Sequence, residues 1–202
     1  TPLATALLYS SHLCDAEVQP EMAKEFALRL RKQLMDLEKL SQDMLRFISN
    51  RPNKTVLTSA RQLMEEAQAS IQALFETKGV TLSVQCAIPD TVMLLVEPKS
   101  IPNALVAILE NALAVSKAGD TVVLSATTES KKLIITIADQ GPGIASTMID
   151  SLFEPFSTTS ANGTGLGLSI AKNTFDAHRG TIGVHNTPEG AVFKITLPIT
   201  QS

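Results

Sequence analysis

The sequence predicts an α+β protein in two parts: a helical hairpin that forms a dimeric four-helix bundle, then an α/β sandwich with a mixed sheet. Two observations lead to this prediction. Over the first part of the chain, apolar side chains recur at helical spacing as far as a cluster of loop residues around Pro52. Beyond Pro52, helical patterns alternate with short strands, several separated only by tight turns, which favours a layered architecture. We therefore expect two domains, residues 1–52 and residues 53–202.

The first domain is predicted to be an antiparallel pair of helices. Residues 21–49 carry apolar side chains three or four positions apart with charged residues on the other sides, and Pro20 precedes them. Residues 2–14 supply a shorter helix with its own apolar stripe, and residues 15–19 supply the turn. Two stripes with little core of their own favour a dimer in which two hairpins form a four-helix bundle. The alternative is a hairpin that packs on its own second domain.

The first elements of the second domain follow from their boundaries and their patterns. Residues 58–77 have a helical pattern that a glycine ends, and residues 81–86 alternate polar and apolar side chains as a half-buried strand does. Residues 92–96 are predicted to form another strand. An apolar helix follows over residues 99–117, with two prolines confined near its start, where proline is tolerated.

The later elements are predicted by the same reasoning. Strands 121–127 and 132–138 come first, and a loop rich in glycine and proline follows them. A helix is expected over about residues 165–177. Strands 181–185 and 191–197 close the domain, and apolar side chains alternate along the last of them.

The bulk composition excludes several classes of protein. The 202 residues are 44% hydrophobic, which is ample for a core. A net charge of −3 without any Lys/Arg run argues against nucleic acid as the principal partner. Cys14 and Cys86 have neither metal-ligand nor CxxC spacing and indicate buried thiols in a reducing compartment. With no apolar run long enough to span a bilayer, we expect a cytoplasmic protein that makes no direct membrane contact through this chain.

Two polar clusters follow apolar segments of the second domain. Asn111 lies late in the apolar helix 99–117, so its amide is expected to face the layer interior or a cleft, although a structural amide bonded to backbone is an equal alternative. Asp139 directly follows a strand and is followed by Gly141 and Gly143. This arrangement places an acceptor beside backbone that a ligand can approach closely, but an Asp-x-Gly-x-Gly segment is also typical of an ordinary turn.

A third cluster is glycine-rich. Gly163, Gly165 and Gly167 alternate at the start of a predicted helix, where free backbone N–H groups make an anion site that a polyphosphate can reach. The small polar residues 157–162 before them suit a mobile flap over a ligand, whereas the alternative is a flexible loop. The segment is neither a Rossmann fingerprint nor a Walker A loop, since it follows no strand directly and lacks the GK[ST] ending.

The order and spacing of these clusters resemble the N, G1, F and G2 boxes of the two-component sensor histidine kinases: Asn111, Asp139-x-Gly-x-Gly, Phe153-x-Pro-Phe156 and Gly163-x-Gly-x-Gly. These kinases carry the Bergerat-type ATP-binding fold shared with DNA gyrase B, heat-shock protein 90 and MutL. The resemblance covers almost the whole chain. The short flap and the Phe-Glu-Pro-Phe segment are most similar to the nitrogen-regulation and flagellar-regulation kinases, which pair with enhancer-binding response regulators.

The resemblance implies a role for each matching residue. Asp139 would accept a hydrogen bond from the exocyclic amine of adenine, and Asn111 would hold Mg²⁺ through its amide oxygen. Gly141 and Gly143 would line the nucleotide. The two phenylalanines of the F box would anchor the flap, with ordinary core packing an equal alternative. The phosphates would lie against the last glycine-rich segment: Gly163, Thr164, Gly165, Leu166 and Gly167.

The start of the chain also matches the family. Thr1-Pro2-Leu3 resembles the last three positions of the phosphoacceptor motif His-acid-x-x-Asn/Thr-Pro-Leu. The resemblance therefore implies an accepting His four residues before Thr1, outside this chain, and the opening without Met leads us to expect a fragment. None of the 3 histidines of the chain matches the motif. Thr1 occupies the position that often orients the water for dephosphorylation of the regulator, which would give it a phosphatase role.

Two positions depart from the family pattern. Ala107 stands one turn before Asn111, where these kinases usually carry a second Asn and the related ATPases a water-activating Glu. This residue argues against simple ATP hydrolysis and weakens the expectation of strong Mg²⁺ binding. Ser160 stands where the flap often holds a Lys for the phosphates. We therefore expect modest nucleotide affinity.

Together these features predict the catalytic core of a dimeric sensor histidine kinase. The core would bind Mg-ATP, phosphorylate a His on the hairpin and relay the phosphoryl group to the receiver domain of a response regulator. Two alternatives remain: a degenerate, non-catalytic nucleotide-binding scaffold for a response regulator, and another kinase or ATPase of the same fold.

Overall fold

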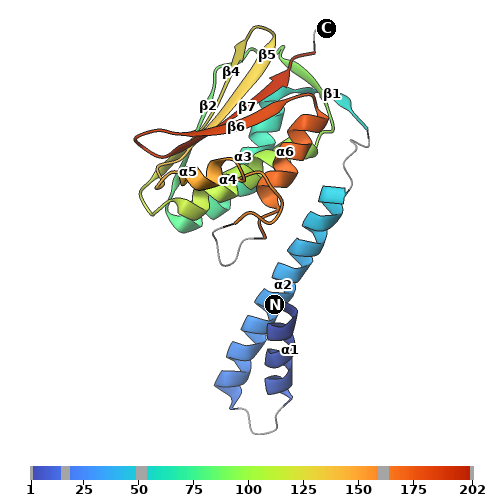
Figure 1. Ribbon diagram of the computed structural model, residues 1–202, viewed down its shortest axis with the longest axis vertical. Coiled ribbons are helices and arrows are strands. Elements are labelled where there is room, and N and C mark those ends of the chain that lie inside the picture. The colour runs from blue at the N-terminus through green and yellow to red at the C-terminus, as the bar shows by residue number, and fades with distance from the viewer. Residues whose placement is uncertain (1, 15–18, 49–53, 159–163, 201–202) are drawn as a thin grey trace. The chain divides into compact units, whose positions relative to one another are not determined.

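The computed structural model describes residues 2–14, 19–48, 54–158 and 164–200 (Figure 1). The chain divides into two compact units, Thr1–Ile48 and Ser49–Ser202, and each is described by itself. The domain boundary predicted after residue 52 lies outside the described residues. Within the described ranges, no helix combines the length and the apolar character needed to cross a membrane.

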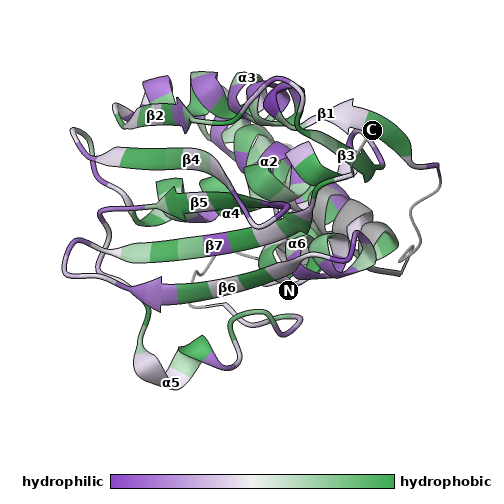
Figure 2. Cartoon of the chain, turned by 90° about the horizontal axis from the view of Figure 1, so that it is seen from above, coloured by the Kyte–Doolittle hydropathy of each residue, from purple (hydrophilic) through white to green (hydrophobic). Residues whose placement is uncertain are grey.

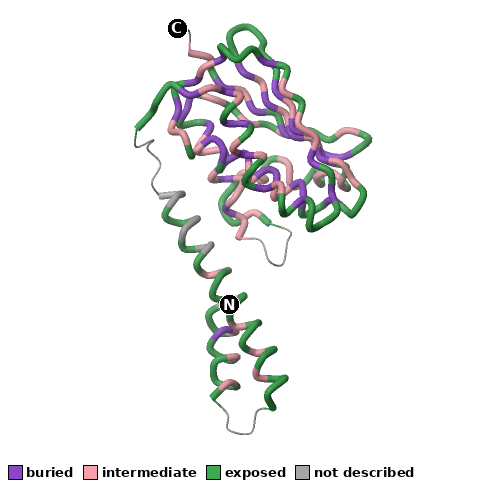
Figure 3. Tube along the Cα trace, turned by 180° about the vertical axis from the view of Figure 1, so that it is seen from behind, coloured by how far each residue is buried: buried purple, intermediate pink, exposed green. Residues whose placement is uncertain are grey.

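The first unit is a hairpin of two helices, α1 (Pro2–Leu13) and α2 (Pro20–Ile48), as the apolar spacing predicts. Aromatic rings hold the two helices together, because Phe26 stacks on Tyr9 and on His12 with centroid separations of 6.0 and 5.2 Å. Among the described residues of the hairpin, Ala6 alone is buried. Where its burial is described, the hairpin is therefore drawn almost entirely in the exposed and intermediate colours of Figure 3.

The second unit contains a five-stranded sheet in the order β2-β4-β5-β7-β6 (Figure 2). β2 and β4 pair in parallel and the other neighbours pair antiparallel, so the predicted mixed sheet is confirmed. A two-residue turn joins β4 to β5, with positive φ at both Ser130 and Lys131, as hairpins of this length require. The strands are β2 (Thr81–Cys86), β4 (Thr121–Glu129), β5 (Lys132–Ala138), β6 (Thr181–Asn186) and β7 (Ala191–Pro198).

Three helices cover one face of this sheet: α3 (Ala60–Lys78), α4 (Ser100–Val115) and α6 (Gly167–Ala177) (Figures 1 and 2). Because side chains alternate along a strand, every second residue of β5 and β7 faces these helices and is buried. The core therefore forms between the helices and the sheet. Its strand residues include Val122, Leu124, Leu133, Ile135, Ile137, Phe193, Ile195 and Leu197.

Two elements were not predicted. β1 (Val56–Ser59) pairs antiparallel with β3 (Met93–Val96) in a separate two-stranded sheet. The prediction of a helix from residue 58 was therefore wrong over its first two residues, because pairing with β3 prevails there and the helix begins only at Ala60. The second unpredicted element is the short helix α5 (Ser146–Ile149), within the loop that follows β5.

Candidate functional site

Asp139 follows β5 directly and is the buried carboxylate of the candidate site, with 5% of its surface exposed. Its Oδ1 accepts hydrogen bonds from the backbone N–H of Gly141 at 2.9 Å and of Ala191 at 3.2 Å. The backbone N–H of Asp139 donates in turn to the carbonyl of Ala191, at 3.0 Å. These bonds fix the carboxylate between the ends of two neighbouring strands, and neither side-chain bond uses Oδ2.

Two glycines allow backbone to pack against Asp139. A Cβ placed on Gly141 would lie 2.7 Å from Cγ2 of Val115 and 3.0 Å from Oδ1 of Asp139. A Cβ placed on Gly190 would lie 2.2 Å from the carbonyl oxygen of Asp139. At Gly190 the contact is with backbone and is closer than real Cβ atoms approach, so the packing of the protein itself requires glycine there. At Gly141 a Cβ would require the side chain of Val115 to move.

One face of α4 connects the predicted clusters. Ala107, Asn111 and Val115 follow one another at intervals of four residues, so they share a face of the helix. Val115 lies beside Gly141, and Ala107 lies 3.8 Å from a Cβ built on Gly167, at the start of α6. Asn111, which is partly exposed, therefore lies on the stretch of α4 between the loop after β5 and the start of α6.

Gly165 is also explained by packing within the protein. Its φ of 67° is in the left-handed region, and a Cβ there would lie 2.5 Å from the carbonyl carbon of Phe156. The backbone N–H of Phe156 donates to the carbonyl of Gly165 at 2.9 Å. The expectation was that this glycine clears space for phosphate, but the structure shows that it clears space for backbone.

The packing at the start of α6 is more open than the packing at Gly165. Thr164 Oγ1 accepts a hydrogen bond from the N–H of the buried Leu166 at 3.3 Å, and Leu166 makes no side-chain capping bond to the helix. A Cβ on Gly167 would meet nothing closer than Ala107, so the packing of the protein does not require glycine here. The predicted residues Gly163 and Ser160, like Thr1, lie outside the described residues.

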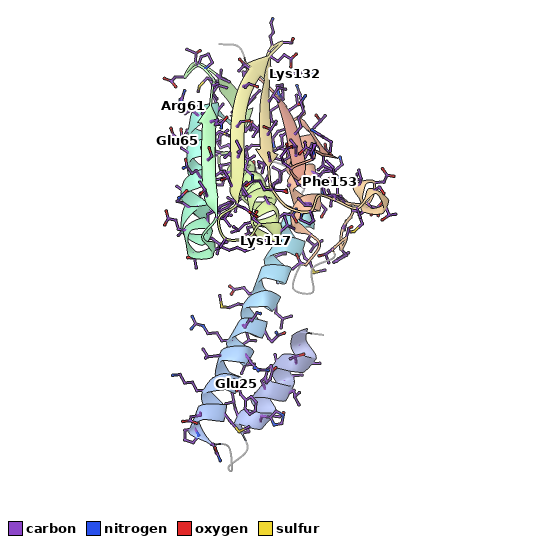
Figure 4. The ribbon with its side chains drawn as sticks, turned by 90° about the vertical axis from the view of Figure 1, so that its left-hand side faces the viewer. Glu25, Arg61, Glu65, Lys117, Lys132 and Phe153 are labelled. Atoms are coloured by element: carbon purple, nitrogen blue, oxygen red, sulfur yellow. The ribbon has the colours of Figure 1, made fainter. Side chains whose placement is uncertain are left out.

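The two phenylalanines of the Phe-Glu-Pro-Phe segment have different environments. Phe153 packs against the core, with its ring edge-on to Phe193 at a centroid separation of 6.4 Å (labelled in Figure 4). Phe156 is 62% exposed and has a φ of 65°. Phe153 can thus anchor the segment through its ring, whereas the contact that Phe156 makes with Gly165 is through its backbone.

Gly143 contacts a residue that the sequence did not single out. Its φ is 73°, and a Cβ on it would lie 3.0 Å from Oδ1 of Asn186 at the end of β6. Sequence reasoning also missed Val115 and Ala191 at the site. Val115 could have been found from its spacing of four residues after Asn111, but no local pattern identifies Asn186 or Ala191, because their contacts are made across the sheet.

Two observations concern other candidate sites among the described residues. Among the residues that the structure describes, no three His, Cys, Asp or Glu side chains come together as metal ligands. A hollow of about 510 Å³ lies at the opposite end of the sheet, beside the C-terminal end of β7. Its buried His178 already uses both ring nitrogens, because Nε2 accepts from the N–H of Glu97 at 3.1 Å and Nδ1 lies 2.7 Å from the carbonyl of Thr174.

Comparison with known proteins identifies relatives of the chain. The family described as histidine kinase-, DNA gyrase B-, and HSP90-like ATPase matches residues 97–201. The sensor histidine kinase ZraS of Salmonella typhi is 31% identical over 189 residues, which cover 91% of this chain and 38% of ZraS. The sensor protein kinase FleS of Pseudomonas aeruginosa is 28% identical over 200 residues, covering 98% of this chain and 49% of FleS. The chain thus spans less than half the length of these relatives.

Solved structures with low sequence identity share the fold. Histidine kinase ThkA, in its complex with the response regulator protein TrrA, superposes with a TM-score of 0.81 at 19% identity, over 99% of this chain and 58% of ThkA. Histidine kinase AdeS of Acinetobacter baumannii superposes with a TM-score of 0.74 at 23% identity, over 100% of this chain and 96% of AdeS. Both likenesses concern the fold: a helical hairpin followed by an α/β domain with a mixed five-stranded sheet.

Proposed function

Because the chain belongs to the histidine kinase-, DNA gyrase B- and HSP90-like ATPase family, as the catalytic core of a sensor histidine kinase, we propose that it binds Mg-ATP and donates the γ-phosphoryl group to a histidine. The observation that carries this proposal is the face of α4 on which Asn111 lies, between the loop after Asp139 and the start of α6. A purine recognised at one end of this face and phosphates at the other would span it.

In this proposal Asp139 selects adenine. Its carboxylate is buried and held by two backbone donors on Oδ1, so it presents an acceptor in a fixed direction. The exocyclic amine of adenine would donate to this carboxylate, whereas guanine presents a carbonyl at the same position. The partly exposed Val115, which lies beside Gly141, would supply apolar contact to the base.

The phosphates would lie at the start of α6. Backbone N–H groups at a helix N-terminus attract anions, and Gly167 leaves space in front of them. Asn111 would hold Mg²⁺, since amide oxygens are suitable ligands and the metal otherwise keeps water and phosphate oxygens. Bound Mg²⁺ would neutralise phosphate charge. Ala107 offers no second polar group on this face, which supports modest affinity for the metal.

The remaining steps involve the hairpin and partners. We propose that the hairpin dimerises into a four-helix bundle and that the accepting His lies four residues before Thr1. The phosphoryl group would pass to the receiver domain of a response regulator, in the cytoplasm. The complex of ThkA with the response regulator protein TrrA supports this choice of partner. A phosphatase role for Thr1 belongs to the same proposal.

The proposal is tested by calorimetric titration of the chain with Mg-ATP and with Mg-GTP. We expect Asp139→Asn to weaken ATP binding by about 30- to 100-fold, the cost of a hydrogen bond to a charged group. The Asn side chain can still accept from Gly141 and Ala191, so the fold should be retained. Asp90→Asn, a matched change in an exposed carboxylate, should leave ATP affinity unchanged.

Two results would contradict the proposal. Equal affinity for ATP and GTP in the unmutated chain would show that Asp139 does not select adenine. No nucleotide binding at all would also contradict it, and would favour a degenerate scaffold for a response regulator that has lost nucleotide binding as well as catalysis. The presence of Ala107 on the shared face of α4 supports this alternative.

A further inference from the structure

Asn186 makes a two-way hydrogen bond with the backbone of Ile144, 42 residues earlier in the chain. Its Oδ1 accepts from the N–H of Ile144 at 2.8 Å, and its Nδ2 donates to the carbonyl of Ile144 at 2.7 Å. Two residues that face each other in an antiparallel sheet exchange the same pair of bonds. Asn186 ends β6, the edge strand of the sheet, so its amide provides one step of sheet pairing to a segment that is not a strand.

The segment held in this way is the glycine-containing loop of the candidate site. Ile144 directly follows Gly143, and a Cβ on Gly143 would lie 3.0 Å from Oδ1 and 3.2 Å from Cγ of Asn186. At its other end the loop is bonded through the N–H of Gly141 to Oδ1 of Asp139. The loop is therefore fixed at both ends, by a carboxylate on one side and by an amide on the other.

Asn186 is itself well supported by the turn that follows it. The N–H of Thr187 donates to the carbonyl of Gly190 at 2.7 Å, and Oγ1 of Thr187 accepts from the N–H groups of Glu189 and Gly190, each at 3.3 Å. The next residue, Ala191, donates to Asp139. One short turn thus positions both the amide that holds Ile144 and a donor that orients the carboxylate.

We propose that Asn186 is a positioning residue for nucleotide binding, through its hold on the loop from Gly141 to Ile144. The inference rests on the proposed function, because it takes this loop as part of the nucleotide site. A loop with two glycines has many accessible backbone conformations, so fixing it only when nucleotide binds would lower affinity. The bonds from Asn186 fix it beforehand.

The experiment compares Asn186→Ala with Asn103→Ala, which removes an exposed amide far from this loop on α4. Amide hydrogen exchange at Ile144 is followed by NMR on the nucleotide-free chain, and affinity for Mg-ATP and for ADP without added metal is measured by calorimetry. We expect Asn186→Ala to speed exchange at Ile144 and to weaken both nucleotides by about tenfold, the loss of two hydrogen bonds. Asn103→Ala should change neither quantity.

Each outcome is decisive for one of the two proposals. If Asn186→Ala speeds exchange at Ile144 but leaves nucleotide affinity unchanged, the positioning role is overturned. It is also overturned if Asn186→Ala leaves exchange at Ile144 unchanged. If the unmutated chain binds no nucleotide, the proposed function fails, and with it the inference that depends on it, whatever Ile144 shows. Should Asn186→Ala not fold, Asn186→Asp replaces it: the acceptor for the Ile144 N–H is kept while the donor is lost, and an intermediate loss of affinity is expected.

Discussion

At the scale of single residues, Asp139 is oriented by backbone donors. Hydrogen bonds from the N–H groups of Gly141 and Ala191 to one oxygen stabilise a buried carboxylate and leave its direction little freedom. A cationic side chain in the same place would compete with a ligand for the carboxylate, whereas backbone donors on Oδ1 do not occupy Oδ2. One oxygen of the carboxylate can therefore be held by the protein while the other recognises a ligand.

Arg179 is a residue whose backbone is in an unfavourable conformation. It follows His178 with a φ of 58° and is exposed. Left-handed backbone costs a residue with a Cβ about 1–2 kcal/mol, while glycine costs about 0.5–1 kcal/mol more entropy on folding. Arg179→Gly should therefore raise the free energy of unfolding by about 0.5–1 kcal/mol, measured by urea denaturation.

The matched control for Arg179→Gly is Lys172→Gly, within α6. Here the backbone is helical, so glycine should lower the free energy of unfolding by about 1 kcal/mol. The ion pair that Lys172 makes with Asp176 is exposed and adds little. If both variants changed the free energy of unfolding in the same direction, the backbone of Arg179 would not be strained.

At the scale of elements, α4 has its C-terminal end capped by a residue of another helix. Lys78, the last residue of α3, donates from Nζ to the carbonyls of Leu113 and Ala114, at 2.5 and 3.1 Å. The last carbonyls of a helix lack donors four residues further on. The carbonyl of Leu113 also accepts from the N–H of Ser116 at 3.2 Å, and a cation near these carbonyls is favoured by the helix dipole. Lys78→Met should lower the free energy of unfolding by about 1 kcal/mol, measured by urea denaturation.

Lys117→Met provides the comparison for Lys78→Met. Lys117 follows α4 closely and is exposed, so loss of its charge should change the free energy of unfolding by less than about 0.5 kcal/mol. If both variants lowered the free energy of unfolding equally, the effect of Lys78 would come from its positive charge alone and not from its hydrogen bonds to the carbonyls.

The sequence located the helices and strands well, but it did not show why glycine is needed at particular positions. Helical and alternating patterns located the sheet and its covering helices, because burial on one side imposes a period. β1 was missed because its four residues have no period of their own and depend on pairing with β3. Gly165 was expected to serve a ligand, but its need for a bare backbone comes from Phe156, a contact that no local pattern encodes.

The site itself was predicted only in part, because it assembles from distant segments. Asp139 and Asn111 were singled out by their chemical types and by what surrounds them in the sequence. Ala191 lies 52 residues beyond Asp139, and only the pairing of β5 with β7 brings the two together. Contacts of this kind follow from strand order, which the spacing of residues in the chain does not determine.

At the scale of the whole molecule, the hairpin exposes large apolar side chains on both of its helices. Figure 3 shows that most of the described hairpin is exposed, and clusters of exposed large apolar residues mark interaction surfaces. A second hairpin would cover them as a four-helix bundle. These residues are Leu3, Leu7, Leu8, Met22, Leu28, Leu34, Met35, Met44 and Leu45.

The dimer is tested by sedimentation of the unmutated chain and of Leu34→Lys. We expect the unmutated chain to sediment as a dimer and Leu34→Lys to shift it to monomer, because a cation buried between apolar helices is costly. Leu95→Lys is the control, since Leu95 lies in the second unit and is 54% exposed, against 53% for Leu34. A monomer in the unmutated chain, or equal dissociation in both variants, would contradict a dimer built by the hairpin.

The hydrogen bonds of His178 limit which imidazoles of the chain can act as nucleophiles. The lone pair on Nε2 is engaged by a backbone donor, and Nδ1 faces a carbonyl and so carries the proton. Neither nitrogen has electrons free to attack an electrophile while the domain remains folded. Any covalent adduct that forms on an imidazole of the native chain therefore belongs to His12 or His185, the two histidines that are exposed.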